Sequence, residues 1–246
     1  MCMYSAIDGV VQEWHHTHLA QFASGGAGLI VAEATAVVPE GRISPRDAGL
    51  WNDEQRDAWV PVVEAIHSRG AVAGIQLAHA GRKASTWWPW ADARGSVPAA
   101  DGGWTTTAPS DIAFDGFAEP AALDQDGIDA VVEGFASATR RALDAGFDVL
   151  EVHGAHGYLL HQFLSPLSNL RDDEYGGSLE NRARLLIRVV GAIREVAGDG
   201  VPVFVRISAT DHAEGGFTPD EAAIVSGWAT EHGADLIDVS SGGLVA

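Results

Sequence analysis

Short apolar runs rich in β-branched residues recur along the chain, and longer segments with helical spacing separate them. Runs of this length and composition are typical of buried strands. We predict strands over 28–34, 72–77, 148–153, 203–207 and 236–239. Residues 1–5 could form the end of one earlier strand.

The segments between these runs have the spacing of amphipathic helices. In 53–68, apolar residues stand at 59, 60, 62, 63 and 66, and Gly70 follows as a stop signal. We predict further helices over 128–145, 179–196 and 219–232. Ser178 and Thr218 precede the last two helices, as N-capping residues do.

Strand–helix–strand repetition predicts an α/β fold with parallel strands and right-handed crossovers. Its period of roughly 30–50 residues fits a (β/α)8 TIM barrel or a doubly wound sheet. No G-x-G-x-x-G pattern follows a strand, which favours the barrel. About five full strands plus the tail of the first are recognisable, fewer than the roughly eight that close a barrel. We therefore expect one TIM-barrel domain over 1–246 that is incomplete at both ends.

Residues 79–125 interrupt the repetition with a long segment that has few helical signals. It contains four of the tryptophans, at positions 87, 88, 90 and 104. A loop of this length in a compact domain is usually functional or disordered, and the tryptophans argue against disorder. We expect a Trp-rich lid or insert over the strand ends. Its aromatic rings could form a wall for a planar ligand or could serve only as hydrophobic packing.

Composition narrows the range of partners. The 246 residues contain 15 Lys and Arg against 34 Asp and Glu, a formal net charge of −19. Such an acidic chain repels polyanions, so we expect neither a nucleic acid nor an anionic membrane as partner. A single cysteine, Cys2, excludes an intrachain disulfide and favours a reducing, cytoplasmic compartment. The first residues lack the features of a signal peptide, and no apolar stretch is long enough to span a bilayer.

Polar side chains gather where the predicted strands end, which is where barrel enzymes keep their chemistry. One such residue taken alone could be a cap or a solvated side chain. Five strand ends carrying them together point to a site. The candidates near these ends are Cys2, Tyr4, Gln76, His79, Arg82, Lys83, Glu151, His153, His156, Tyr158 and Arg206.

Two histidine groups leave alternatives open. His153 and His156 could be metal ligands, donors to an anionic oxygen, or structural residues, and a zinc site would need a third ligand. Glu151 or Cys2 might serve as that ligand, although no H-E-x-x-H or H-x-H pattern occurs. The group His15-His16-x-His18 has helical spacing, and we expect it to be solvated surface rather than a metal site.

Several segments together resemble the Old Yellow Enzyme family of flavin-dependent ene-reductases, in its thermophilic-like or xenobiotic-reductase-like class. They are MCMYSA (1–6), GLIVAEATAVVPEGRI (28–43), GIQLAHAGRKA (74–84), HGAHGYLLHQFLSPLSNLRDDEYGGSLENR (153–182) and FVRISATD (204–211). The resemblance implies a TIM barrel that holds non-covalent FMN at the carboxyl ends of its strands. It also implies hydride transfer from NADPH or NADH, through the flavin, to the β-carbon of an activated alkene of the enone type.

The resemblance assigns the flavin contacts residue by residue. Cys2 would lie against the flavin near N5, and Ala34 would contact it through its backbone. Gln76 would bind the pyrimidine edge. Arg206 would lie near N1 and O2, where a fixed cation favours the reduced anionic flavin. Ser240 would touch the flavin edge.

The same resemblance assigns the catalytic residues. His153 and His156 would donate to the carbonyl oxygen of the substrate and make its β-carbon electrophilic. Tyr158 would deliver a proton to the α-carbon. Tyr4 would reach the substrate oxygen. The implied partner is a small-molecule alkene, and the implied assembly of the full-length protein is a homodimer or homotetramer.

This sequence departs from the family pattern at both ends. Family members have a longer first strand, and they continue into two last strands whose loops hold the FMN phosphate. We therefore expect residues 1–246 alone to bind FMN weakly or not at all, and to fold poorly. The alternatives are a non-catalytic barrel remnant and a metal-dependent barrel hydrolase that uses His153 and His156. A dienoyl-CoA reductase is a further relative, but its iron–sulfur cysteines have no counterpart here.

Overall fold

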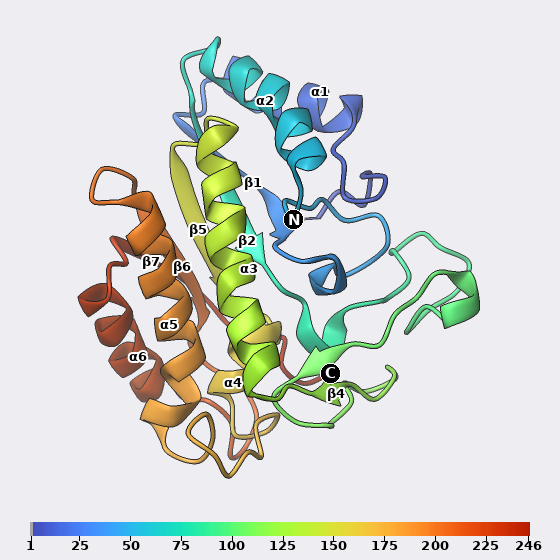
Figure 1. The fold of residues 1–246 in the computed structure, drawn as a ribbon, viewed down its shortest axis with the longest axis vertical. Helices are drawn as coiled ribbons and strands as arrows, with labels where there is room; N and C mark the ends of the chain where they lie inside the picture. Colours follow the sequence, from blue (N-terminus) through green and yellow to red (C-terminus); the bar gives the residue numbers. More distant parts are fainter. Residues whose placement is uncertain (1) are drawn as a thin grey trace.

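A parallel five-stranded sheet organises the molecule, and the computed structural model describes it over residues 2–246. The strand order follows the chain, β1-β2-β5-β6-β7, so each strand pairs with its predecessor in the sheet. The strands are β1 (Leu29–Ala36), β2 (Val72–Ala78), β5 (Val149–Gly154), β6 (Val203–Ser208) and β7 (Leu236–Ser240) (Figure 1). All five predicted strands are therefore confirmed.

The sheet is open over residues 2–246, with β1 and β7 at its two edges. Residues 2–5 pair with none of the described strands, so the expected end of an earlier strand is not formed there; Met1 lies outside the described residues. Five strands instead of eight is the arrangement expected for an incomplete barrel. The described helices include none that is long and apolar enough to cross a membrane.

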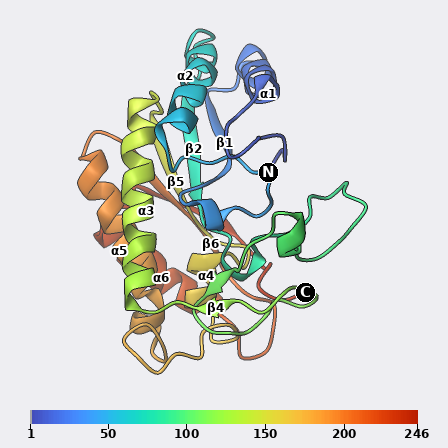
Figure 2. The ribbon, with the colours of Figure 1, turned by 45° about the vertical axis from the view of Figure 1, so that its right-hand side comes forward.

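Helices cover one face of the sheet, and both chain ends lie on its other side (Figure 2). The predicted helices are confirmed as α2 (Asp53–His67), α3 (Gln125–Asp144), α5 (Leu179–Ala197) and α6 (Pro219–Glu231). Asp124 caps α3 by accepting a hydrogen bond from the Gly127 amide, so this helix begins three residues earlier than predicted.

The core lies between this helical layer and the sheet. Phe135 of α3 and Ile193 of α5 are fully buried against strand residues such as Ile75 and Leu150. The buried face runs from β1 to β6, and β7 at the edge is covered only in part, since Ile237 is half-buried.

Two helices were not predicted, for different reasons. In α1 (Glu13–Ser24) a polar residue, His15, takes a core position and interrupts the apolar pattern. In α4 (Leu159–Leu164) every residue is buried, so no alternation of polar and apolar faces marks the helix.

The 79–125 segment is held by short elements rather than by helices. It contains the 3-10 turns η2 (Gly81–Lys83) and η3 (Ala99–Asp101), and a pair of two-residue parallel strands, β3 (Thr107–Ala108) and β4 (Ala121–Ala122). The part between η2 and β3 extends away from the helical layer (Figure 2).

Arg182 joins three elements at the lower end of the helical layer. Its guanidinium donates to the carbonyl oxygens of Leu164 and Gly177, and it forms a 2.6 Å ion pair with Glu221. Glu221 in turn completes the N-terminal cap of α6 with Thr218.

Replacing Arg182 by Met keeps the aliphatic stem and removes all three interactions. We expect Arg182→Met to lower the free energy of unfolding by about 3–5 kcal/mol, because it leaves buried partners without a donor. Arg184→Met, which removes a half-buried guanidinium two residues away that donates to the Glu174 carbonyl and the Asn181 side chain, should lower it by no more than about 1.5 kcal/mol. Chemical denaturation of both variants measures the difference, and equal effects would contradict this role.

Candidate active site

One pocket lies where the strands end, and it gathers eight of the nine predicted site residues. Its volume is about 590 Å³, within the usual range of roughly 300–1,000 Å³ for small-molecule sites. The predicted residues that line it are Cys2, Tyr4, Ala34, Gln76, His153, His156, Tyr158 and Arg206. Pro89 also lines it, so the 79–125 segment contributes to the wall.

Strand register brings these side chains together from distant parts of the sequence. Gln76 of β2 stands opposite Glu151 of β5, and His153 of β5 stands opposite Arg206 of β6. Arg206 is in turn opposite Asp238 of β7. Because neighbouring parallel strands point the same way, the carboxyl end of every strand contributes to the same edge.

Glu151 fixes the orientation of the Gln76 amide. The Gln76 Nε2 group donates to Glu151 Oε1 at 2.6 Å, and both side chains are buried. Burial raises the pKa of Glu151, and the hydrogen bond from Gln76 partly offsets this shift. With its amino group directed to Glu151, Gln76 retains its amide oxygen as an acceptor towards a ligand.

Arg206 supplies the positive charge in this pocket. Its Nε lies 3.2 Å from Asp238 Oδ2, and the two side chains are about one-third exposed, at 35% and 38%. The angle at Nε is too poor for a hydrogen bond, so this buried N–H has no accepting partner among the described residues. A ligand atom with a partial negative charge could accept a hydrogen bond from this N–H group.

The two candidate histidines are close to one another and uncharged near neutral pH. Their rings are nearly perpendicular, with His156 Nδ1 3.4 Å from His153 Nε2. Burial lowers the pKa of both, to about 4 for His156, and the nearby Arg206 adds to the effect. Neutral imidazoles can each present one N–H donor to an oxygen without carrying a charge.

Ser240 contacts a pocket histidine. Its hydroxyl lies 2.5 Å from His156 Nε2, and Ser240 is not among the described residues that line the pocket. Its place at the flavin edge stays a prediction.

Tyr158 lies beside this pair with its phenol protonated. Its ring is 4.9 Å from that of His153, at 81°. Burial raises the pKa of Tyr158 above its usual value. The ammonium group of Lys83, the only lysine, lies 5.2 Å from the Tyr158 ring and donates to the carbonyl oxygens of His156 and Gly243.

A buried histidine–carboxylate pair, His161 and Asp211, supports the His153–Tyr158 loop, and the sequence analysis missed it. The Gly157 amide donates to His161 Nδ1, and His161 Nε2 lies 2.8 Å from Asp211, with both side chains fully buried. His156 itself has a φ of 58°, in the left-handed region. Such a conformation persists when surrounding contacts determine it.

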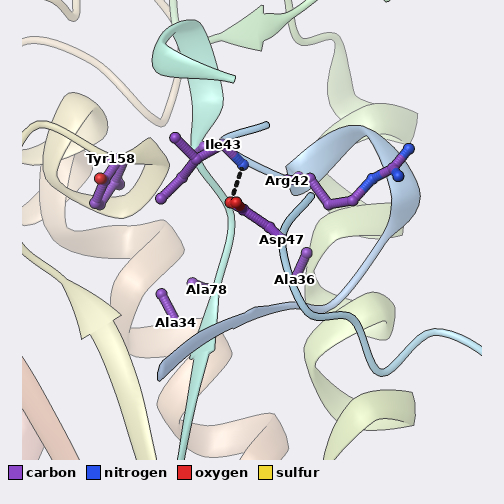
Figure 3. Close-up of a pocket in the computed structure, with 9 residues that line it drawn as sticks. Ala34, Ala36, Arg42, Ile43, Asp47, Ala78 and Tyr158 are labelled. Carbon is purple, nitrogen blue, oxygen red and sulfur yellow. Dashed lines mark hydrogen bonds between the residues drawn. The ribbon is translucent and has the colours of Figure 1, made fainter. Parts of the chain in front are cut away.

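Asp47 is a further buried residue that the sequence analysis did not identify. It lines a small cavity that also borders Tyr158 and Ala34, and its carboxylate accepts a hydrogen bond from the Ile43 amide (Figure 3). The Ser44 hydroxyl donates to the same carboxylate. Burial raises the pKa of Asp47 to about 7. It lies in a loop after β1 rather than at a strand end, so position along a strand could not mark it.

The expectation of a solvated surface is wrong for the first histidine of the His15-His16-x-His18 group. His15 is fully buried and its Nε2 lies 3.1 Å from Glu33 Oε1, whereas His16 and His18 are half-buried. Within residues 2–246, no group of three or more His, Cys, Asp or Glu side chains is arranged to hold a metal ion.

Comparison with known proteins assigns the family. The model of the NADH:flavin oxidoreductase / NADH oxidase family matches residues 1–246. The chain belongs to this family. A protein named NADPH dehydrogenase from Listeria welshimeri is 48% identical over 248 residues, which cover 100% of this chain and 68% of that protein. Another from Halalkalibacterium halodurans is 47% identical, with the same coverage.

Solved structures agree with this assignment. Morphinone reductase superposes with a TM-score of 0.83 at 32% identity, over 97% of this chain and 65% of that protein. An old yellow enzyme homologue from Zymomonas mobilis gives 0.81 at 31%, over 96% and 66%. The chain thus spans about two thirds of the length of these relatives, and its fold is an incomplete TIM barrel of the Old Yellow Enzyme family.

The pocket residues fit the flavin that gives this family its name. The buried Arg206 Nε has no accepting partner among the described residues, and the Gln76 amide oxygen is directed away from Glu151. Together they offer a donor and an acceptor, as the pyrimidine edge of a flavin requires. The β1 residues Val31–Ala34 provide a narrow backbone wall next to them.

Asp47 makes the stability of this family member depend on pH. Its folded-state pKa of about 7 lies above the ordinary 3.8, so between about pH 4 and pH 7 the folded protein keeps a proton that the unfolded chain releases. Stability therefore decreases as the pH rises through this window. Asp47→Asn removes the titrating group, and its unfolding free energy relative to the natural protein should rise by about 1–3 kcal/mol from pH 5 to pH 8. Urea unfolding at both pH values measures this change, and a pH-independent difference would refute the assignment.

Proposed function

We propose that this chain forms the flavin- and substrate-facing part of an FMN-dependent oxidoreductase that uses NADPH or NADH to reduce an activated alkene. The observation that carries the proposal is the convergence of Gln76, Arg206, His153, His156 and Tyr158 on one pocket. The convergence occurs in a chain of the flavin oxidoreductase family. The relatives named NADPH dehydrogenase support NADPH as the reductant.

The flavin side of the pocket consists of Gln76, Arg206, Ala34 and Cys2. Gln76 accepts from the pyrimidine edge, and Arg206 places a fixed cation beside it, which favours a reduced, anionic ring. Bound FMN would supply the hydride chemistry that links the nicotinamide to the alkene. Ala34 would contact the ring through its backbone, and the Cys2 thiol would lie near it.

The substrate side of the pocket consists of the histidine pair and the two tyrosines. His153 and His156 donate to the carbonyl oxygen of an enone-type substrate, which withdraws electron density from the double bond and makes the β-carbon electrophilic. Tyr158 keeps its proton because burial raises its pKa. It therefore remains protonated until it donates to the α-carbon as a general acid. Tyr4, which also lines the pocket, reaches the substrate oxygen.

The insert over 79–125 would act as a lid for this pocket, and Pro89 supports the role by lining it. We further propose a cytoplasmic enzyme and, for the natural full-length chain, a homodimer or homotetramer. The non-catalytic remnant remains a competing proposal, and flavin content decides between the two. No observation favours a metal-dependent hydrolase.

The direct test is to purify the protein from its complete natural gene and record its visible spectrum and its reduction of a cyclic enone by NADPH. A flavin spectrum with enone-dependent NADPH oxidation supports the proposal. A colourless protein that remains colourless after incubation with FMN would support the remnant.

Tyr158→Phe removes the proposed proton donor and keeps the ring beside His153. Flavin reduction by NADPH should remain near the natural rate, while alkene reduction slows by roughly 10²–10⁴-fold, the usual range for loss of a general acid. Stopped-flow measurement separates the two half-reactions. Equal slowing of both would indicate that Tyr158 is structural.

His153→Ala and His156→Ala each remove one proposed donor to the substrate oxygen. Each should weaken the binding of a phenolate inhibitor by about 1.5–3 kcal/mol, the usual contribution of a hydrogen bond to a charged group. Titration of the flavin absorbance measures the affinity, and His232→Ala on an exposed helix end is the control. Unchanged affinity in both variants would reject the role.

A further inference from the structure

A buried histidine–carboxylate pair connects helix α1 to the pocket wall, because Glu33 itself lines the pocket. His15 of α1 and Glu33 of β1 face each other with Nε2 3.1 Å from Oε1, and their side chains are 0% and 1% exposed. His15 Nδ1 accepts from the Gln12 amide at 2.9 Å, so the ring proton lies on Nε2 and points to Glu33. The angle at Nε2 is poor for a hydrogen bond, but no closer partner is present among the described residues.

The second carboxylate oxygen of Glu33 holds the segment that carries Cys2 and Tyr4. Glu33 Oε2 accepts from the Met3 amide at 2.6 Å. Met3 lies between Cys2 and Tyr4, and both of these line the pocket. One buried carboxylate therefore connects helix α1 to the middle of a pocket wall.

A bulge in β1 makes this connection possible. The register between β1 and β2 shifts between Ala32 and Ala34, so Glu33 has no partner of its own in β2. A bulge changes the direction of a side chain at one strand position. Ala32, Glu33 and Ala34 all line the pocket, and Glu33 in addition accepts the hydrogen bond from the N-terminal segment.

The segment needs such an anchor because its backbone is strained. Tyr4 has a φ of 49°, a left-handed conformation that a residue with a side chain rarely adopts. Besides the Met3–Glu33 bond, the Ser5 hydroxyl donates to the Met3 carbonyl at 2.9 Å and the Ala6 amide donates to Arg46 at 3.0 Å. The Met3–Glu33 bond is the one of these three that joins Met3 to a residue outside the N-terminal segment.

We propose that Glu33, oriented by His15, is a positioning residue that sets where Cys2 and Tyr4 stand in the pocket. The expected effect on flavin and substrate binding rests on the proposed function. The anchoring of the N-terminal segment by Glu33 does not depend on it. A buried carboxylate requires hydrogen-bond donors. Loss of the His15 side chain should therefore disturb the bond between Glu33 and the Met3 amide as well.

Cys2 is the only cysteine within residues 1–246, so the part of the reaction with a disulfide reagent such as DTNB that Cys2→Ser removes reports on this segment. The rate would be measured on the complete natural protein, both with flavin and after its removal. We expect His15→Phe and Glu33→Leu to raise the rate about tenfold or more, because a lost hydrogen bond to a charged group changes a local opening equilibrium by about that factor. With flavin bound, both should also raise KM for the alkene more than they lower the rate of flavin reduction.

Three controls separate positioning from general destabilisation. His15→Gln keeps a donor towards Glu33 and should return the thiol rate towards the natural value. His16→Phe makes the matching change one position along α1, where the half-buried ring lies near the exposed carboxylate of Glu13. Arg182→Met destabilises a distant part of the fold. Neither of these last two should alter the thiol rate.

If a single variant does not fold, the double variant His15→Phe/Glu33→Leu replaces the whole pair by apolar residues and avoids an unpaired buried charge. The same rise in thiol rate is expected from it. A natural thiol rate in a folded Glu33→Leu or double variant would overturn the proposal. Because the flavin-free measurement does not need an active enzyme, a failure of the proposed function and a failure of this inference give different results.

Discussion

Parallel strand pairing is the constraint on which the candidate site depends. It places Gln76 opposite Glu151, His153 opposite Arg206, and Arg206 opposite Asp238, although these residues are far apart in sequence. A slip of one residue between two strands would turn the participating side chain to the helix-covered face. The apolar residues on that face, such as Ile75 and Leu150, therefore fix the register and with it the polar edge.

Burial then determines the protonation states in the pocket. It lowers the pKa of His153 and His156 and raises that of Tyr158, so the two histidines are neutral and the phenol keeps its proton. Arg206 remains the positive group among them, and Glu151 and Asp238 lie on the same edge. The fixed cation, Arg206, suits a ligand that carries negative charge. The neutral donors, His153 and His156, suit a second ligand whose carbonyl group must be polarised.

The strands and the larger helices could be predicted because each has a strong local pattern. The runs around Ile75, Leu150 and Val205 are continuous and apolar, and Ser178 and Thr218 mark helix starts. The pocket residues at strand ends followed from that fold, and the family resemblance added their expected roles.

What could not be predicted depends on contacts between distant residues. His15 has the helical spacing of a surface residue, and its buried partner Glu33 lies 18 positions away in another element. Asp47 lies in a loop whose burial follows from the packing of Tyr158 and Ala34 around it. Ser240 reaches His156 because β7 pairs with β6, and its position in the sequence does not reveal that contact.

A crystal structure of the complete natural protein with FMN and a phenolate inhibitor tests the central claim most directly. We predict the flavin ring in the pocket at the carboxyl ends of β1, β2, β5 and β6, with Gln76 and Arg206 on its pyrimidine edge. The phenolate oxygen should lie within hydrogen-bond distance of both His153 and His156. A flavin bound elsewhere, or a phenolate that contacts neither histidine, would contradict the claim that strand register builds a flavin and substrate site here.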